Sequence, residues 1–158
     1  MSDFDKAFTI VIGHEGGYVN DPQDPGGETK YGISKRAYPA VDIAELGLED
    51  AKRIYRDDYW DACCCDDYHW PLNLYVFDGA VNQGVQVTIK MLQAALDLRQ
   101  DGIIGKKTLA AAREASDWHM ARFMARRAMR YFGTRRFDRF GEGWLIRTYN
   151  VTRQGNQT

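Results

Sequence analysis

Hydrophobic residues recur along most of the chain at the spacing of amphipathic helices. In the first such segment they occupy positions i, i+3, i+4, i+7 and i+8, which lie on one face of a helix. These residues are Phe4, Ala7, Phe8, Val11 and Ile12. Gly16 and Gly17 follow as a stop signal, because glycine adopts the left-handed C-cap conformation without a steric penalty. The pattern therefore predicts a first helix over residues 3–15.

The same spacing predicts the other helices, which are separated by Gly, Pro and polar clusters. The longer ones are expected over residues 48–62, 72–83, 87–98, 118–132 and 143–150. A short helix is expected over 34–38, a loop over 63–70 and a frayed end over 151–158. Brief strand-prone pieces at 18–19 and 30–31 flank a turn-rich segment. The predicted fold class is therefore all-α, with a small β-hairpin in the long loop after the first helix.

One carboxylate, Glu15, stands where the first predicted helix meets this loop. The partial negative charge of a helix C-terminus and the apolar neighbours Phe8, Ile12 and Tyr18 favour its protonated form. A carboxyl group that keeps its proton beside a long polar loop is suited to general-acid catalysis. The competing interpretation is a solvated residue at an ordinary helix end.

Several short motifs follow one another along the chain. In the loop they are Glu15-Gly16-Gly17-Tyr18, Asn20-Asp21-Pro22, Asp24-Pro25-Gly26-Gly27 and Thr29-Lys30-Tyr31-Gly32-Ile33-Ser34, and later Asp58-Tyr59-Trp60, Val76-Phe77-Asp78 and Gly143-Trp144. Together they resemble glycoside hydrolase family 108, which contains N-acetylmuramidases of the lysozyme type from phage endolysins and bacterial genomes. The resemblance implies a lysozyme-like helical fold. It also implies that Glu15 is the catalytic acid in hydrolysis of the β-1,4 bond between N-acetylmuramic acid and N-acetylglucosamine in peptidoglycan.

Further site residues are expected in the same loop. Asp24 is the candidate for the second carboxylate, which activates water or stabilises the transition state. Asp21 is its rival, with an Asx-turn and substrate binding as its alternative roles. Thr29 is placed to orient the attacking water. Tyr18 and Tyr31 are expected to stack on sugar rings or to hold the loop.

Two polar residues, Asp78 and Asn82, lie four positions apart in the segment 72–83, which is apolar almost all round and typical of a buried helix. Buried polar groups need partners, so we expect both to bond to neighbouring backbone or to the active-site loop. Structural anchoring is favoured over substrate contact for both, and Asn82 is kept as a candidate for substrate binding.

The second half of the chain carries a different motif. Asp101-Gly102-Ile103-Ile104-Gly105, followed by Thr108-Leu109, resembles the helix–turn–helix of peptidoglycan-binding modules. Tight-turn glycines are the structural alternative. We therefore divide the chain into a catalytic part, 1–84, and a helical peptidoglycan-binding-like part, 85–158, packed as one compact unit.

Charge is distributed unequally between these two parts. Residues 1–84 contain 7 Lys and Arg against 16 Asp and Glu, whereas residues 85–158 contain 14 against 6. The basic helix 118–132 is expected to turn Met129 and Phe132 inward and its arginines, Arg127 included, outward. An anionic envelope surface is the partner that this asymmetry favours, and packing of the two halves on each other is the alternative. No nucleic-acid partner is expected, because no recognised binding motif accompanies the charge.

The remaining features concern redox state, metals and location. Cys63, Cys64 and Cys65 are consecutive, which disfavours pairing among them and predicts free thiols. Cys-x-x-Cys spacing is absent and His14-Glu15 lacks the second His of His-Glu-x-x-His, so no metal or other cofactor is expected.

Neither a signal peptide nor an apolar run of about 20 residues is recognised. We expect a monomer that is made in the host cytoplasm and reaches the cell wall after release, as a phage endolysin does.

Two other functions compete with hydrolysis. A lytic transglycosylase cuts the same bond with a single Glu and without water, and yields anhydro-muramyl products. A non-catalytic wall-binding protein would use the region around Gly105 together with the basic helix.

Overall fold

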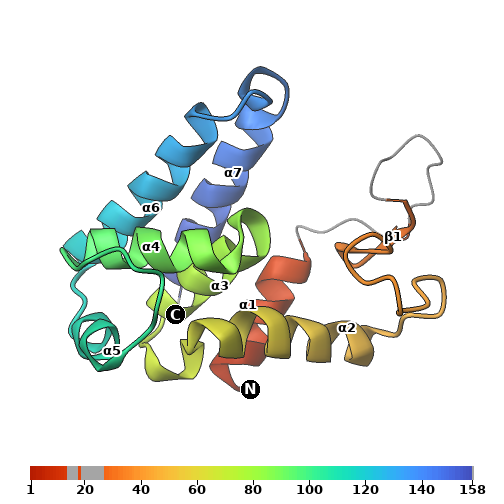
Figure 1. Ribbon diagram of the computed structural model, residues 1–158, viewed down its shortest axis with the longest axis horizontal. Helices are drawn as coiled ribbons and strands as arrows, with labels where there is room; N and C mark the ends of the chain where they lie inside the picture. Colours follow the sequence, from red (N-terminus) through yellow and green to blue (C-terminus); the bar gives the residue numbers. More distant parts are fainter. Residues whose placement is uncertain (14–17, 19–26, 158) are drawn as a thin grey trace.

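The computed structural model describes residues 1–13, 18 and 27–157, and shows a mainly α-helical, lysozyme-like fold (Figure 1). The α-helices of the described part are α1 (Asp3–Ile12), α2 (Leu48–Tyr55), α3 (Leu72–Gln83), α4 (Val85–Ala95), α5 (Lys106–Arg113), α6 (Asp117–Phe132) and α7 (Phe137–Gly155). Strands β1 (Thr29–Lys30) and β2 (Ile33–Ser34) form a small antiparallel hairpin. The predicted fold class is confirmed.

Helix α3 is the centre of the molecule, and α1, α4, α6 and α7 all pack against it. Its apolar residues face neighbours on every side, and all positions from Leu72 to Ala80 are buried. The predicted bounds of this helix are confirmed. Since its C-terminal turn leads directly to α4 through Gly84, α3 also fixes the position of Asn82 and Gln83 at one end of the core.

Aromatic rings join α1 and α3 to the segment after α2. Phe4, Trp60 and Phe77 form a mutually edge-on cluster with ring centroids 5.3 to 5.9 Å apart. Edge-to-face packing suits the charge distribution of aromatic rings. The predicted helix 48–62 is interrupted, because after Tyr55 the chain winds as a π-helix over Arg56–Trp60 and then as a 3₁₀ turn over Asp61–Cys63. The wider winding carries Trp60 into the core, where its side chain is fully buried.

Helix α1 begins with a capping box formed by Ser2 and Asp5, each of which bonds the other's backbone N–H. It ends at Ile12 with Gly13 as its C-cap. The predicted last residue, Glu15, lies outside the described residues. Figure 1 shows the C-terminal end of α1 directed between the hairpin and the pair α6–α7.

The hairpin pairs Thr29 with Ser34 and Lys30 with Ile33. Tyr31 and Gly32 at its tip have φ of 53° and 74°, which is the geometry of the tight turns that match strand twist. Tyr31 therefore lies in the turn and not in a strand as predicted. The short helix expected over 34–38 is wrong, because the backbone of Ser34 is used by the strand pairing and only turns follow it.

The C-terminal helix is the largest departure from the predicted elements. Helix α7 spans Phe137–Gly155, whereas a short helix over 143–150 with a frayed end was expected. Its last turns are packed: Val151 and Gly155 are buried, and Trp70 Nε1 donates to the Gly155 carbonyl at 2.8 Å. Tyr75 Oη donates to the Thr152 carbonyl at 3.1 Å. Anchoring by side chains of a distant segment keeps the end of the helix ordered.

Within the described part of the chain, no helix combines the length and the apolar character that crossing a membrane requires.

Candidate active site

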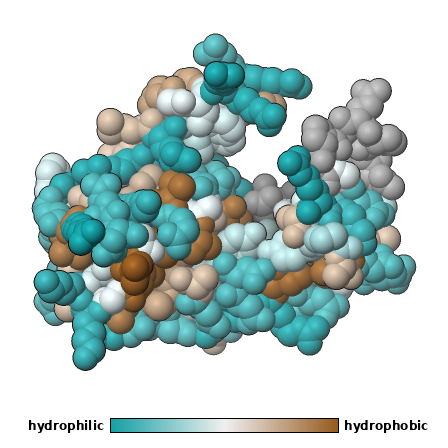
Figure 2. Space-filling model, in the orientation of Figure 1, coloured by the Kyte–Doolittle hydropathy of each residue, from teal (hydrophilic) through white to brown (hydrophobic). Residues whose placement is uncertain are grey.

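An open recess separates the hairpin from the distal ends of α6 and α7 (Figure 2). Helix α1 leads into it from below in the view of Figure 1. The predicted catalytic residues Glu15 and Asp24 and the predicted substrate residue Asp21 lie outside the described residues, so their roles stay predictions. The remaining candidates, Thr29, Tyr18, Tyr31 and Asn82, are described.

On the hairpin side, Tyr18 Oη donates to the Glu28 carboxylate at 2.6 Å. The Tyr18 side chain is still 47% exposed. The backbone carbonyl of Glu28 in turn accepts from the Lys35 N–H at 2.8 Å, which ties it to the far side of the hairpin. Such a contact is expected if Tyr18 holds the loop in place, which was one of the two roles predicted for it. Glu28 was not singled out from the sequence, because nothing in its local pattern shows which hydroxyl it meets.

Thr29 and Tyr31 belong to the hairpin itself. Thr29 Oγ1 lies 3.4 Å from the Gly27 carbonyl, and the Tyr31 carbonyl accepts from Tyr55 Oη at 2.8 Å. The Lys30 ammonium lies 5.7 Å from the centroid of the Tyr31 ring. The bond from Tyr55 fastens the hairpin tip to α2, so the wall of the recess is anchored to the core.

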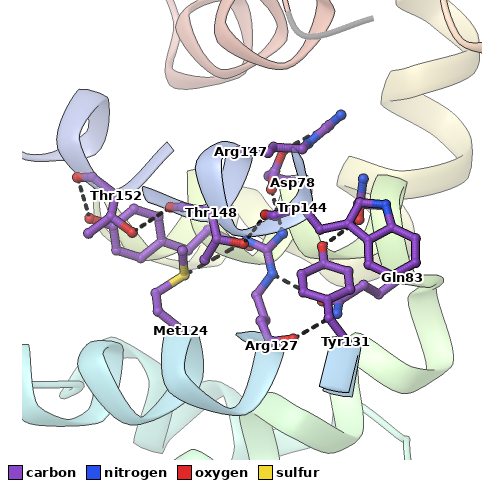
Figure 3. Close-up of polar contacts among 11 residues, drawn as sticks. Asp78, Gln83, Met124, Arg127, Tyr131, Trp144, Arg147, Thr148 and Thr152 are labelled. Carbon is purple, nitrogen blue, oxygen red and sulfur yellow. Dashed lines mark hydrogen bonds and ion pairs between the residues drawn. The ribbon is translucent and has the colours of Figure 1, made fainter. Parts of the chain in front are cut away.

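On α3, the carboxylate of Asp78 is fully buried and is bound by two arginines (Figure 3). Arg127 on α6 binds one oxygen, and Arg147 Nε on α7 donates to the other at 2.9 Å. Burial alone would raise the pKa of Asp78, but the two guanidinium groups outweigh it and lower the pKa. Among the described residues, Asp78 is thus anchored by side chains from α6 and α7.

The predicted orientation of α6 is wrong at several positions, Ala121 and Ala125 among them, which are exposed although they were expected to face inward. Arg127 is fully buried, whereas Met129 and Phe132 are 70% and 59% exposed. The buried stripe contains Phe123, Met124, Arg127 and Tyr131. Arg127 lies four residues after Phe123 and four before Tyr131, a spacing that indicates an inward position. The prediction placed it outward because its side chain is charged.

At the end of α3, Asn82 Oδ1 accepts a hydrogen bond from Tyr131 Oη, and the Tyr131 ring stacks on Trp144 at 5.0 Å between centroids. Gln83 exchanges two bonds with Arg127: its Nε2 donates to the Arg127 carbonyl at 3.0 Å, and Arg127 Nε donates to its Oε1 at 3.2 Å (Figure 3). Tyr131 and Arg147 were not predicted as site residues. Packing between helices that are distant in the sequence brings Tyr131 to Asn82 and Arg147 to Asp78. No local sequence motif predicts these contacts.

The three thiols are free, as predicted, with Cys63 and Cys65 buried and Cys64 partly exposed. Burial raises the pKa of Cys64 and of Cys65. Among the residues that the structure describes, no group of three or more His, Cys, Asp or Glu is arranged to hold a metal ion.

Comparison with known proteins places this geometry in a family. The glycosyl hydrolase 108 pattern matches residues 8–84. Among solved structures, that of SagA from Brucella abortus is 34% identical, with a TM-score of 0.86, and the match covers 98% of this chain and 96% of that chain. A search of curated proteins finds no match. The chain therefore belongs to the glycosyl hydrolase 108 family and is a glycoside hydrolase.

Proposed function

We propose that the protein is an N-acetylmuramidase that hydrolyses the β-1,4 bond between N-acetylmuramic acid and N-acetylglucosamine in bacterial peptidoglycan. The observation that carries the proposal is the family match over residues 8–84, which contains the whole run from Glu15 to Ser34. The open recess between the hairpin and α6–α7 is where we expect the glycan strand to bind (Figure 2).

In the proposed mechanism, Glu15 protonates the oxygen of the leaving sugar, as the general acid of a glycosidase does. Asp24 acts as the second carboxylate, with Asp21 as its rival. Thr29, at the start of β1, orients the attacking water. Tyr18 and Tyr31 contact sugar rings from the hairpin side, where their positions are held by Glu28 and Tyr55.

The decisive experiment is mass spectrometry of muropeptides released from purified peptidoglycan. We expect the wild type to release fragments with a reducing N-acetylmuramic acid end, and Glu15→Gln to reduce the rate at least about 10²-fold. Glu114→Gln, at the exposed C-cap of α5, is the matched control and should leave the rate unchanged. Anhydro-muramyl ends would instead identify a lytic transglycosylase. Undiminished release by Glu15→Gln would reject the assignment of the acid, and no release by the wild type would favour a wall-binding protein.

Asp24→Asn and Asp21→Asn, compared in the same assay, separate the two candidates for the second carboxylate. The one that acts with Glu15 should lose most of the rate, whereas a brace for the loop should lose stability together with a smaller part of the activity. Comparing melting temperatures with rates distinguishes these two effects.

We further propose that the enzyme acts as an endolysin, with residues 85–158 contributing contacts to the wall. Expression inside a bacterium should then cause lysis only when the membrane is permeabilised, and turbidity measurements with and without a permeabilising agent test this. Lysis without permeabilisation would contradict the proposal.

A further inference from the structure

A polar pocket of about 250 Å³ lies where the C-terminal turn of α3 meets α6 and α7. Its lining residues are Asn82, Gln83, Arg130, Tyr131, Thr134 and Trp144. These residues come from the C-terminal end of α3, from α6 and α7, and from the turn between α6 and α7. None of these residues has a role in the mechanism proposed above, although the sequence made Asn82 a candidate for substrate binding.

The aromatic part of the pocket is rigid. Trp144 is partly exposed, and its ring contacts those of Tyr131, stacked at 5.0 Å, and Phe140, tilted at 5.9 Å. An aromatic side chain held in this way offers apolar surface without loss of conformational entropy on binding. The C–H groups of a sugar ring are a suitable partner for such a surface.

The polar part of the pocket is pre-organised. Asn82 Oδ1 accepts a hydrogen bond from Tyr131 Oη, whereas the Asn82 Nδ2 group makes no hydrogen bond to another described residue. Thr134 Oγ1 donates to the Tyr131 carbonyl at 2.8 Å, so its oxygen remains available as an acceptor. The pocket thus presents an amide donor and a hydroxyl acceptor beside an aromatic ring, which matches the hydroxyl and acetamido groups of a sugar.

Arg130 adds a positive charge to this set. It is exposed and makes no ion pair with another described residue. A neighbouring groove of about 600 Å³ between α4 and α6 shares Arg130 and Thr134 and adds Lys90 and Arg126. Positive charge therefore continues from the pocket along one side, and an anionic substituent on the ligand would complement it.

We propose that this pocket is a saccharide subsite that binds one ring of the glycan strand, with Arg130 facing a carboxylate-bearing substituent of that strand. The inference rests on the proposed function and names residues that select its substrate. Asn82 and Thr134 bind the ring, Trp144 packs against it, and Tyr131 is a positioning residue that orients the Asn82 amide.

The test compares two soluble ligands, a hexamer of N-acetylglucosamine without carboxylates and peptidoglycan glycan strands of similar length that carry them. Asn82→Asp keeps the acceptor for Tyr131 but removes the amide donor, and Thr134→Val removes the hydroxyl at nearly constant volume. We expect each to raise Kd about five- to tenfold for both ligands, and to raise KM by a similar factor for the cleavable strands while kcat stays the same. Arg130→Gln should raise them only for the carboxylate-bearing strands. Arg153→Gln, which removes an exposed charge elsewhere on the surface, is the control.

The outcomes separate the subsite from the proposed function. If Kd and KM of all three variants stay within about twofold of the wild type and hydrolysis is intact, the subsite proposal is overturned while the hydrolase proposal stands. A wild type that binds the oligosaccharides without cleaving them, and loses binding in Asn82→Asp, supports the subsite and rejects the hydrolase. Equal losses on both ligands in Arg130→Gln overturn the role given to the carboxylate. Melting temperatures equal to that of the wild type show that each variant is folded.

Discussion

The carboxylate of Asp78 on α3 accepts a hydrogen bond from Arg127 on α6, and neither side chain is exposed to solvent. Its other oxygen accepts from Arg147 on α7 at 2.9 Å. A single buried carboxylate therefore joins three helices. Because Arg127 also bonds Gln83 at the end of α3, the same group fixes the helix end that borders the pocket beside Trp144.

Asp78→Asn should destabilise the fold strongly. The substitution keeps the shape of the side chain but leaves the buried Arg127 without its counter-charge, and breaking a buried ion pair costs about 3–5 kcal/mol. Urea unfolding measures the loss. Asp97→Asn is the matched control, because Asp97 pairs with Arg122 at the surface with its side chain 72% exposed, and it should cost less than about 1 kcal/mol. Similar losses in both variants would contradict the anchoring role of Asp78.

The same carboxylate gives stability a defined pH dependence. The two arginines lower the pKa of Asp78 in the folded protein, whereas in the unfolded chain an Asp titrates near about 3.9. The ion pair therefore contributes its full stabilisation when the pH is above the pKa of Asp78 in the unfolded chain. That stabilisation is lost as the pH falls through the pKa of Asp78 in the folded protein. The difference in unfolding free energy between the wild type and Asp78→Asn should be constant near neutral pH and shrink below about pH 4. A difference that stays constant into strong acid would reject this ion pair as its source.

The local pattern predicted the elements that depend on local interactions. The bounds of α3 followed from an apolar run that begins after Pro71 and ends at Gly84. A hairpin was also expected in the loop after α1, from strand-prone pieces at 18–19 and 30–31, but the strands that the structure describes are Thr29–Lys30 and Ile33–Ser34. The pattern failed where distant segments decide the outcome: the last turns of α7 are held by Trp70 and Tyr75, which lie 85 and 77 residues away from their partners.

The candidate site shows the same limit. The family motif named Glu15, Asp24 and the hairpin residues as candidates, because they follow one another in the chain, and the catalytic roles of Glu15 and Asp24 stay predictions. The contact between Asn82 and Tyr131 spans 49 residues, and the buried position of Arg127 depends on the counter-charge of Asp78. A charge on a helix is usually assigned to the solvated face, and only the partner on another helix reverses that expectation.

Two glycines of α7 should respond in opposite ways to alanine. A Cβ at Gly143 would meet no atom within 4 Å, so Gly143→Ala should stabilise the protein by about 0.5–1 kcal/mol through helix propensity. A Cβ at Gly155 would lie 2.7 Å from the Tyr75 ring and 2.9 Å from Pro71, so Gly155→Ala should destabilise it by about 1–3 kcal/mol. Thermal unfolding of both variants checks the signs. Stabilisation by Gly155→Ala would show that the end of α7 is not held as described.

The thiols should differ in reactivity. Cys63 and Cys65 are buried and Cys64 is partly exposed, so one thiol per native chain should react with a disulfide reagent and three after unfolding. Burial raises the pKa of Cys64, and since the thiolate is the reactive form, the native reaction should be slow at neutral pH and faster at higher pH. Cys64→Ser should remove the native reaction. Continued reaction in that variant would show that one of the two buried thiols becomes accessible.

The basic end of α6–α7 should bind an anionic wall surface. Arg135 and Arg136 are exposed between these helices, and neither forms an ion pair with another residue of the described chain. Replacing both with Gln should weaken binding to purified cell walls by roughly tenfold at low salt, and the difference should disappear as salt screens the charges. Lys106 and Lys107, both exposed on α5, provide a control pair with the same loss of charge. A sedimentation assay measures both double variants across a salt series. If the two pairs weaken binding equally, the attraction comes from the total charge of the C-terminal half. If only the Arg135 and Arg136 pair does so, it comes from this end of the helices.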